Sequence, residues 1–269
     1  MASSGVHLMC PNRQPEPLRA AKNAPNVLYI VLDDTGFGQL GCYGSPINTP
    51  NIDALAENGL RYNNMHTTAL CSPSRTCMLT GRNHHSNAMA CITEGSTGYP
   101  GSNGNIPFEN GFLSEMLLQH GYNTYAIGKW HLTPADQISA AGPYDRWPLG
   151  DVVLNASTAS SAAKRINITQ SLSTTTTKSN PKTPEEGYHI TEDLVDKAVS
   201  LIADAKQVAP DKPFFMYFCT GAITLLITCA KSGRISTRKF DDGWEAYRQK
   251  HLPNKRDGHS PARCRTVAP

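Results

Sequence analysis

The sequence predicts an α/β fold with a mostly parallel central sheet and helices on both faces. Short apolar runs, typical of buried strands, alternate along the chain with segments whose apolar residues have helical spacing. Strands that alternate with helices indicate a parallel sheet, because each crossover helix returns the chain to the end of the sheet at which the previous strand began. The chain has 269 residues, 39% hydrophobic and 17% charged, and can therefore bury a substantial core.

The first strand is expected at residues 26–32, Asn-Val-Leu-Tyr-Ile-Val-Leu. This continuous apolar run predicts a central strand that is covered on both faces. Thr49 and Pro50 then provide a helix cap and a first helical residue, and Gly59 ends that helix.

Two further helix–strand units are expected downstream. Apolar spacing predicts a helix over residues 113–120, closed by Gly121, and a strand over residues 122–127. A third helix is expected over residues 194–205, followed by an apolar strand at residues 214–218. The chemistry of parallel α/β sheets gathers just beyond the carboxyl ends of the strands. Three segments fall there: Asp33-Asp34, Gly128-Lys129-Trp130-His131, and Cys219 onward.

Asp33 and Asp34 are adjacent carboxylates directly after the first strand. Two like charges at one point suit a hard cation such as Ca²⁺ or Mg²⁺, although such pairs also occur in solvated turns. The following Gly36-x-Gly38-x-x-Gly41 pattern does not favour a dinucleotide site. The carboxylates would repel a pyrophosphate, and no helix begins before Thr49 to receive one.

Residues 71–82, Cys-Ser-Pro-Ser-Arg-Thr-Cys-Met-Leu-Thr-Gly-Arg, carry the most specific motif. Any one cysteine beside a proline is commonly a buried structural residue, but the matched positions at fixed spacing favour a functional motif. The stretch resembles the signature of the formylglycine-dependent sulfatases, a cysteine followed by x-Pro-x-Arg and Leu-Thr-Gly-Arg. The resemblance implies an incomplete alkaline-phosphatase-like sulfatase core, in which a formylglycine-generating enzyme converts Cys71 to 3-oxoalanine (formylglycine). One hydroxyl of the hydrated aldehyde attacks sulfur, and the other later expels sulfate.

The resemblance also implies the roles of the other site residues. The chain is expected to be an arylsulfatase-like sulfuric ester hydrolase that acts on a sulfate ester with one Ca²⁺ ion, Mg²⁺ being possible. Lys129 and His131 alternate after a strand, so both can point to one side. The implied catalytic residues are Cys71, Arg75, Lys129 and His131, and the implied metal ligands are Asp33, Asp34 and the oxygen derived from Cys71. Arg75 is expected to stabilise the nucleophile, whereas Lys129 and His131 bind sulfate and assist the leaving group. A phosphonate or phosphodiester hydrolase of the same superfamily is the alternative, since sulfate and phosphate esters are both tetrahedral.

The domain organisation is expected to be uneven. Residues 1–24 form a polar tail, and residues 25–222 form the N-terminal part of the sulfatase α/β domain. Within that part, residues 151–180 are an aberrant Ser/Thr-rich insert without periodicity. Residues 223–269 are an aberrant, truncated segment. We expect a chain of this extent to be nearly inactive.

A shifted reading frame explains the aberrant segments. Residues 224–229, Thr-Leu-Leu-Ile-Thr-Cys, can be encoded by ACG CTC CTC ATC ACG TGC. With a preceding C, the same bases read His-Ala-Pro-His-His-Val, which the family carries at this place. A similar shift converts residues 157–164 into Phe-Tyr-Gly-Phe-Leu-Gly-Gly, also as in the family. The second alternative is therefore a non-catalytic fragment from a faulty reading frame.

The sequence gives no evidence for a nucleic-acid or membrane partner. The net charge of +3 gives no case for nucleic acid or an acidic membrane, and no aromatic residues interleave with a basic stripe. The apolar run at residues 27–32 is too short to cross a bilayer.

Residues 1–24 lack the apolar region of a secretory signal, and the eight cysteines lack metal-type spacing. We therefore expect a cytoplasmic protein with reduced thiols.

Overall fold

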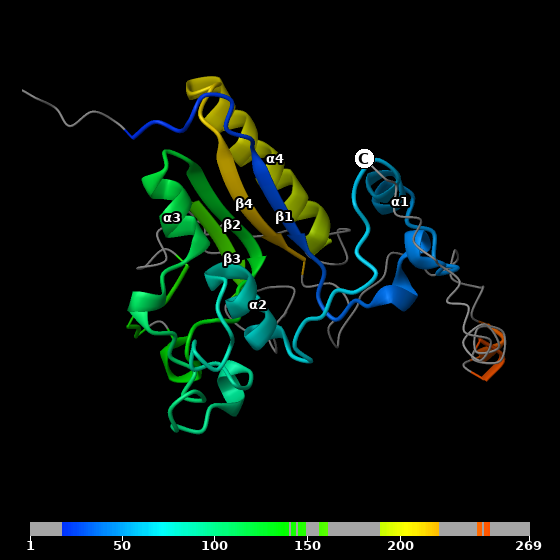
Figure 1. Cartoon of the computed structure of the whole chain (residues 1–269), viewed down its shortest axis with the longest axis horizontal. Helices are drawn as coiled ribbons and strands as arrows, with labels where there is room; N and C mark the ends of the chain where they lie inside the picture. The colour runs from blue at the N-terminus through cyan, green and yellow to red at the C-terminus, as the bar shows by residue number, and fades with distance from the viewer. Residues whose placement is uncertain are drawn as a thin grey trace, which may run out of the picture.

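The computed structural model describes residues 18–139, 141–143, 145–148, 156–160, 189–220, 241–243 and 245–247. These residues form one four-stranded sheet in the order β1-β4-β2-β3, and every pair of neighbouring strands is parallel (Figure 1). The strands are β1 (Val27–Val31), β2 (Asn123–Lys129), β3 (Ala156–Ser160) and β4 (Phe214–Cys219). The predicted parallel α/β fold is confirmed.

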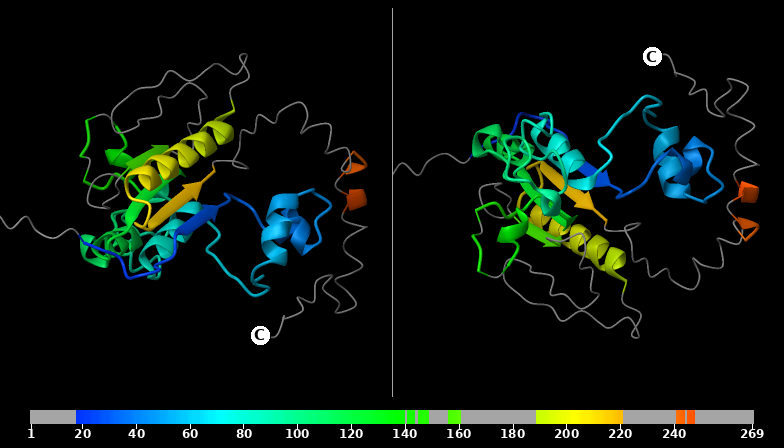
Figure 2. Two further views of the ribbon diagram at one scale, coloured as in Figure 1. Left: turned by 90° about the horizontal axis from the view of Figure 1, so that it is seen from above. Right: turned by 90° about the horizontal axis from the view of Figure 1, so that it is seen from below.

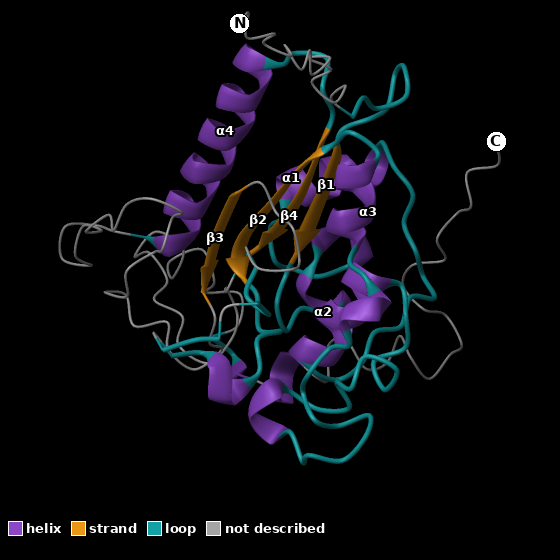
Figure 3. Ribbon diagram, turned by 90° about the vertical axis from the view of Figure 1, so that its left-hand side faces the viewer, coloured by secondary structure: helices purple, strands orange, loops and turns teal. Residues whose placement is uncertain are grey.

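Helices lie on both faces of this sheet. The α-helices are α1 (Pro50–Glu57), α2 (Cys71–Thr80), α3 (Leu113–Gln119) and α4 (Ile190–Val208). The short 3₁₀ helices are η1 (Phe37–Gln39), η2 (Gly41–Tyr43), η3 (Thr93–Gly95), η4 (Phe108–Asn110) and η5 (Ala135–Gln137). Helix α4 covers one face, and α2 and α3 lie on the other (Figure 3). Helix α1 lies apart from the sheet, beyond the carboxyl end of β1 (Figure 2).

Strand β4 supplies the core of both layers. Its six residues are all buried, and successive side chains of a strand point to opposite faces. Phe215 and Tyr217 pack in the cluster that contains Leu79 of α2, with residues of α3 partly buried against it. Phe214, Met216 and Phe218 pack on the other face in the cluster that contains Leu194 and Ala198 of α4. This alternation explains why both faces carry helices.

Strand β1 differs from its predicted place. The expectation of a central strand is wrong for the described residues, where β1 is an edge strand and Leu28 and Ile30 are about half exposed. A continuous apolar run indicates strand structure, but it does not determine strand order. The other predicted helices and strands are present, with ends shifted by a few residues. Helix α2 and strand β3 were not predicted from periodicity.

Parts of the predicted domain organisation lie outside the described residues. Of the Ser/Thr-rich segment 151–180, only residues 156–160 are described, and their backbone forms β3. Of residues 223–269, only 241–243 and 245–247 are described. The predicted domain boundaries therefore stay predictions. Within the described part of the chain, every helix is too short or too polar to span a bilayer.

Candidate active site

The parallel register brings the carboxyl ends of three strands to one edge. Val31 of β1 and Gly128 of β2 both pair with Cys219 of β4. The residues that follow these strands therefore emerge side by side, as expected for an α/β sheet. This edge receives Asp33 from β1 and Lys129 from β2.

Helix α2 begins at this edge with Cys71 as its first residue. Leu70 precedes the helix in an extended conformation, and Gly81 ends it in the left-handed region at φ 68°. Pro73 lies in the first turn, where its missing N–H costs no intrahelical hydrogen bond. Arg75 follows four residues after Cys71 and shares its face of the helix. The start of the helix favours negative charge, because its first backbone N–H groups have no intrahelical acceptors.

A buried charge network centres on Asp33. Nη2 of Arg75 is 2.9 Å from Oδ1 of Asp33, and Nζ of Lys129 is 2.5 Å from Oδ2. Nη1 of Arg75 also donates to the Lys129 carbonyl at 2.9 Å and to the Tyr217 hydroxyl at 3.1 Å. The three charged side chains are 2–5% exposed. Two cations thus share one carboxylate, and the network carries an excess positive charge that favours a nearby anion.

A second network runs through Cys71, His131 and Glu94. Nδ1 of His131 is 3.1 Å from Sγ of Cys71, and its Nε2 is 2.8 Å from Oε2 of Glu94. Burial favours a higher pKa for Cys71, but the hydrogen bond and charge of His131 outweigh it and lower the pKa of the thiol. Burial favours a lower pKa for His131, but hydrogen bonds to Cys71 and Glu94 outweigh it and raise the pKa of the imidazole. The two opposite shifts share one cause, the contact between the thiol and the imidazole.

Two site residues adopt an uncommon backbone conformation. Asp34 and His131 have φ values of 50° and 56°, in the left-handed region that non-glycine residues rarely occupy. Such conformations cost free energy and persist only where the surrounding structure holds them in place. They are found most often at functional sites. The turn also separates the two adjacent carboxylates, since Asp33 is buried and Asp34 is exposed.

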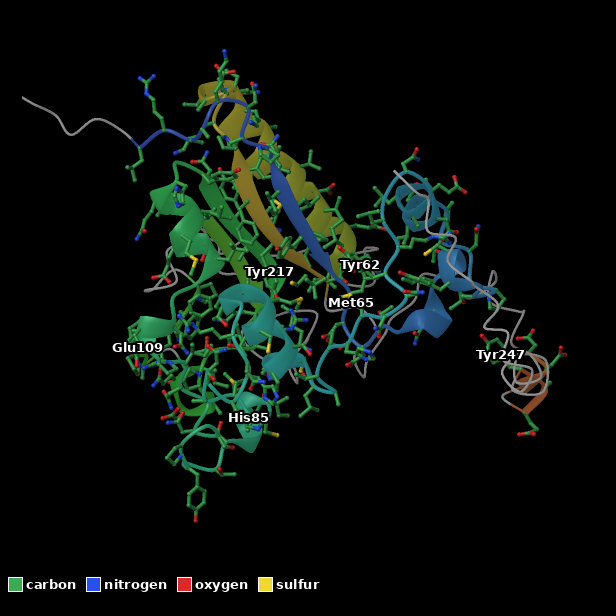
Figure 4. All side chains as sticks on the ribbon, viewed as in Figure 1. Tyr62, Met65, His85, Glu109, Tyr217 and Tyr247 are labelled. Carbon is green, nitrogen blue, oxygen red and sulfur yellow. The ribbon has the colours of Figure 1, made fainter. Side chains whose placement is uncertain are left out.

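A cavity of about 580 Å³ opens at this edge. Its polar wall includes Asp33, Asp34, Cys71, Ser74 and Arg75. The cavity lining also includes apolar and aromatic residues, namely Tyr43, Tyr62, Met65, Leu70 and Met78. Tyr62 and Met65 lie between the α1 segment and the carboxyl end of β1 (Figure 4). Lys129 and His131 are not among the residues that line the cavity. They reach it through Asp33 and Cys71, respectively.

The carboxylates fit a hard cation as part of its ligand set. Asp33, Asp34 and Cys71 line the same cavity, and carboxylate oxygens are preferred Ca²⁺ ligands. Ca²⁺ takes about six to eight oxygens, more than these residues supply. Among the described residues, no three or more His, Cys, Asp or Glu side chains are grouped to hold a metal ion.

The structure brings five of the six predicted site residues into two networks and places Asp34 on the wall of the cavity that Asp33, Cys71 and Arg75 also line. Sequence reasoning missed Glu94 and Tyr217. Glu94 lies in the short helix η3, whose sequence gives no functional signal, and Tyr217 is indistinguishable in sequence from its apolar strand neighbours. Only the folded chain shows that they contact His131 and Arg75.

The chain is similar to known sulfatases. The family model described as Sulfatase matches residues 25–224. Human arylsulfatase A is 42% identical over 120 residues, which are 42% of this chain and 22% of that protein. The N-acetylglucosamine-6-O-sulfatase of Bacteroides thetaiotaomicron is 34% identical over 142 residues, which are 52% of this chain and 22% of that protein. The matched part thus spans about a fifth of these curated relatives.

Solved structures show the same fold. The crystal structure of Ps i-CgsB has a TM-score of 0.58 and 22% identity, and the match covers 79% of this chain and 48% of that chain. A protein from a Bacteroides thetaiotaomicron locus for the metabolism of multiple glycosaminoglycans has a TM-score of 0.56 and 17% identity, over 85% of this chain and 48% of that chain. These likenesses show the alkaline-phosphatase-like fold.

Proposed function

The chain belongs to the sulfatase family, and on this premise we propose that its site hydrolyses sulfuric esters with a formylglycine made from Cys71. The observation that carries the proposal is the place of Cys71. It begins α2, lines the cavity and lies 3.1 Å from His131. The Asp33 network beside it has the excess positive charge that a sulfate group complements.

The residues of the chain have separate roles in this proposal. Asp33 and Asp34 would hold a divalent cation, Ca²⁺ or Mg²⁺. When both groups are present, the aldehyde hydrate supplies a hydroxyl nucleophile and the cation supplies polarising charge. Arg75 and Lys129 donate hydrogen bonds to the Asp33 carboxylate and make the pocket attractive to an anion. His131 holds or moves a proton at residue 71.

The apolar wall of the cavity supports an aryl or similarly apolar ester as substrate. Tyr43, Tyr62 and Met65 line the same cavity as the polar groups, and aromatic side chains provide flat apolar surface for a ring. The sulfate group would lie toward Cys71, and the apolar alcohol would lie toward Tyr62. This arrangement separates the charged and apolar ends of the ester.

The first test is conversion of Cys71. When the chain is coexpressed with a formylglycine-generating enzyme, the Cys71 peptide should show the mass change of thiol-to-aldehyde conversion. Cys71→Ala should abolish the change, whereas Cys77→Ala, in the same helix, should keep it. An unmodified peptide, under conditions that convert a control sulfatase, would contradict the proposal.

The second test is sulfate release from an aryl sulfate, at high concentration of the converted chain. Even slow release supports the proposal if Cys71→Ala lacks it, and equal release by both chains opposes it. Assay of a matched phosphodiester separates the alternative. Faster Cys71-dependent cleavage of the phosphodiester would favour the phosphodiesterase.

A further inference from the structure

The carboxylate of Glu94 lies on the far side of His131 from the proposed nucleophile. Glu94 comes from η3, His131 follows β2 and Cys71 begins α2, so three separate segments form one line of contacts. The distances are 2.8 Å from Glu94 Oε2 to His131 Nε2 and 3.1 Å from His131 Nδ1 to Cys71 Sγ. Each ring nitrogen thus has one partner.

The chemistry of these partners determines which nitrogen carries the proton in the neutral ring. A carboxylate only accepts hydrogen bonds, so Nε2 of His131 must donate to Glu94. A neutral imidazole has one donor and one acceptor, and Nδ1 is then the acceptor. This acceptor faces Sγ of Cys71. A hydroxyl or thiol at position 71 can therefore give its proton to the ring.

The environment holds Glu94 in this place. Its Oε2 also accepts a hydrogen bond from Thr93 Oγ1 at 3.1 Å, and the Thr93 carbonyl accepts one from Ser96 Oγ at 2.7 Å. Thr93 is buried, and the Glu94 side chain is 27% exposed. The imidazole of His131 is 1% exposed, so water competes little for its nitrogens. Burial favours a higher pKa for Glu94, but the hydrogen bonds from His131, the backbone and Thr93, together with the charge of His131, outweigh it and lower the pKa of the carboxyl.

We propose that Glu94 is a positioning residue that holds His131 as the Nε2–H tautomer, with Nδ1 directed at residue 71. The inference rests on the proposed function for its catalytic meaning, but the geometry is a property of the unmodified chain. A carboxylate, an imidazole and a nucleophile in this order recur in hydrolases on unrelated folds, where the carboxylate orients the ring. In this chain, Glu94 has the position of that carboxylate relative to His131 and Cys71.

The direct test is the tautomer of His131, measured by nitrogen-15 NMR of the full-length chain that carries Cys71→Ser. The serine hydroxyl stays protonated at a pH high enough for the ring to be neutral, so it can donate to Nδ1, which a thiolate could not do. The His131 signals are identified by their loss in His131→Gln. The expected result is a proton on Nε2 in Cys71→Ser and a mixture of tautomers when Glu94→Ala is added. Glu94→Asp in place of Glu94→Ala should restore part of the Cys71→Ser pattern. A ring with its proton on Nδ1 in Cys71→Ser overturns the inference, whether or not the Glu94 variants fold.

The chain offers a matched control. Glu109 is the middle residue of η4 as Glu94 is of η3, and it is exposed and lies away from the site (Figure 4). Glu109→Gln should leave the His131 spectrum unchanged. In the converted chain, Cys71-dependent sulfate release should fall at least about 10-fold in Glu94→Gln, an effect of the size seen when a carboxylate that orients a metal-ligating histidine is lost. Glu109→Gln should not lower it.

The outcomes separate this inference from the proposed function. Turnover that is equal in Glu94→Gln and Glu109→Gln would overturn the positioning role and leave the sulfatase proposal standing. An Nε2–H tautomer that Glu94→Ala disrupts would support the positioning of the ring, even if Cys71 were never converted. In that case only the proposed function would fail.

Discussion

Replacement of Asp33 by asparagine should destabilise the folded chain far more than the same change at Asp34. Asp33 is 3% exposed and is the carboxylate that Arg75 and Lys129 share, so Asp33→Asn leaves two buried cations without their counter-charge. Breaking a buried pair by removing one partner costs about 3–5 kcal/mol of unfolding free energy. Asp34 is exposed, and its replacement should change this free energy by less than about 0.5 kcal/mol.

Urea or thermal unfolding of the unmodified chain, followed by circular dichroism without added metal, measures this difference. At about 2–4 °C per kcal/mol, Asp33→Asn should lower Tm by about 6–20 °C. Adding Arg75→Met to Asp33→Asn should recover part of the loss, because the excess of buried cations falls from two to one. The reasoning is refuted if both asparagine variants unfold together, or if the added Arg75→Met deepens the loss.

Three further predictions follow from the site and the sequence. The alkylation rate of Cys71 should level off at lower pH than that of Cys77, because the pKa of Cys71 is lowered by its histidine partner and the pKa of Cys77 is raised by burial. Iodoacetamide labelling followed by mass spectrometry measures the two rates, and equal pH profiles would contradict the prediction. Gly128→Ala should cost more than about 3 kcal/mol of unfolding free energy, since its φ is 95° and its Cβ would lie 1.8 Å from a β4 carbonyl oxygen. Gly44→Ala, at φ 90° with open space, should cost only about 1 kcal/mol, and similar losses in urea unfolding would exclude the close approach as the cause. Genomic and transcript reads across residues 224–229, which lie outside the described part of the chain, should show codons that encode His-Ala-Pro-His-His when shifted; codons that cannot do so rule out the frame shift.

The strands and most helices could be predicted because their signals are local. The apolar run at residues 214–218 predicts a buried strand, and β4 is buried along its whole length. Helix α2 could not be predicted from local signals, since residues 71–80 have neither strong apolar spacing nor a polar N-cap. Its position depends on contacts with the sheet, among them the Arg75 hydrogen bonds to Lys129 and Tyr217. Such tertiary contacts leave no periodic pattern.

The candidate site was predictable where residues follow strands and unpredictable where a loop approaches from elsewhere. Lys129 ends β2 and Asp33 lies two residues beyond the end of β1, and both strands pair in parallel with β4, so their meeting follows from topology. Glu94 reaches His131 from a 3₁₀ turn whose path no local pattern determines. A resemblance in sequence motifs identified the nucleophile position, but the partner of its histidine required the folded chain.

Trp130, between Lys129 and His131, explains how residues 129–131 contribute both to the network around Asp33 and to the network through Cys71 and Glu94. Trp130 is 2% exposed and packs in the core cluster on the α2–α3 face. Its ring stacks on Phe112 with centroids 6.0 Å apart and meets Tyr217 edge-on at 6.4 Å. With Trp130 anchored in the core, Lys129 is held at Asp33 and His131 at Cys71. The Lys-Trp-His order thus combines two charged groups with one packing anchor, and the core of the sheet fixes the spacing of the site.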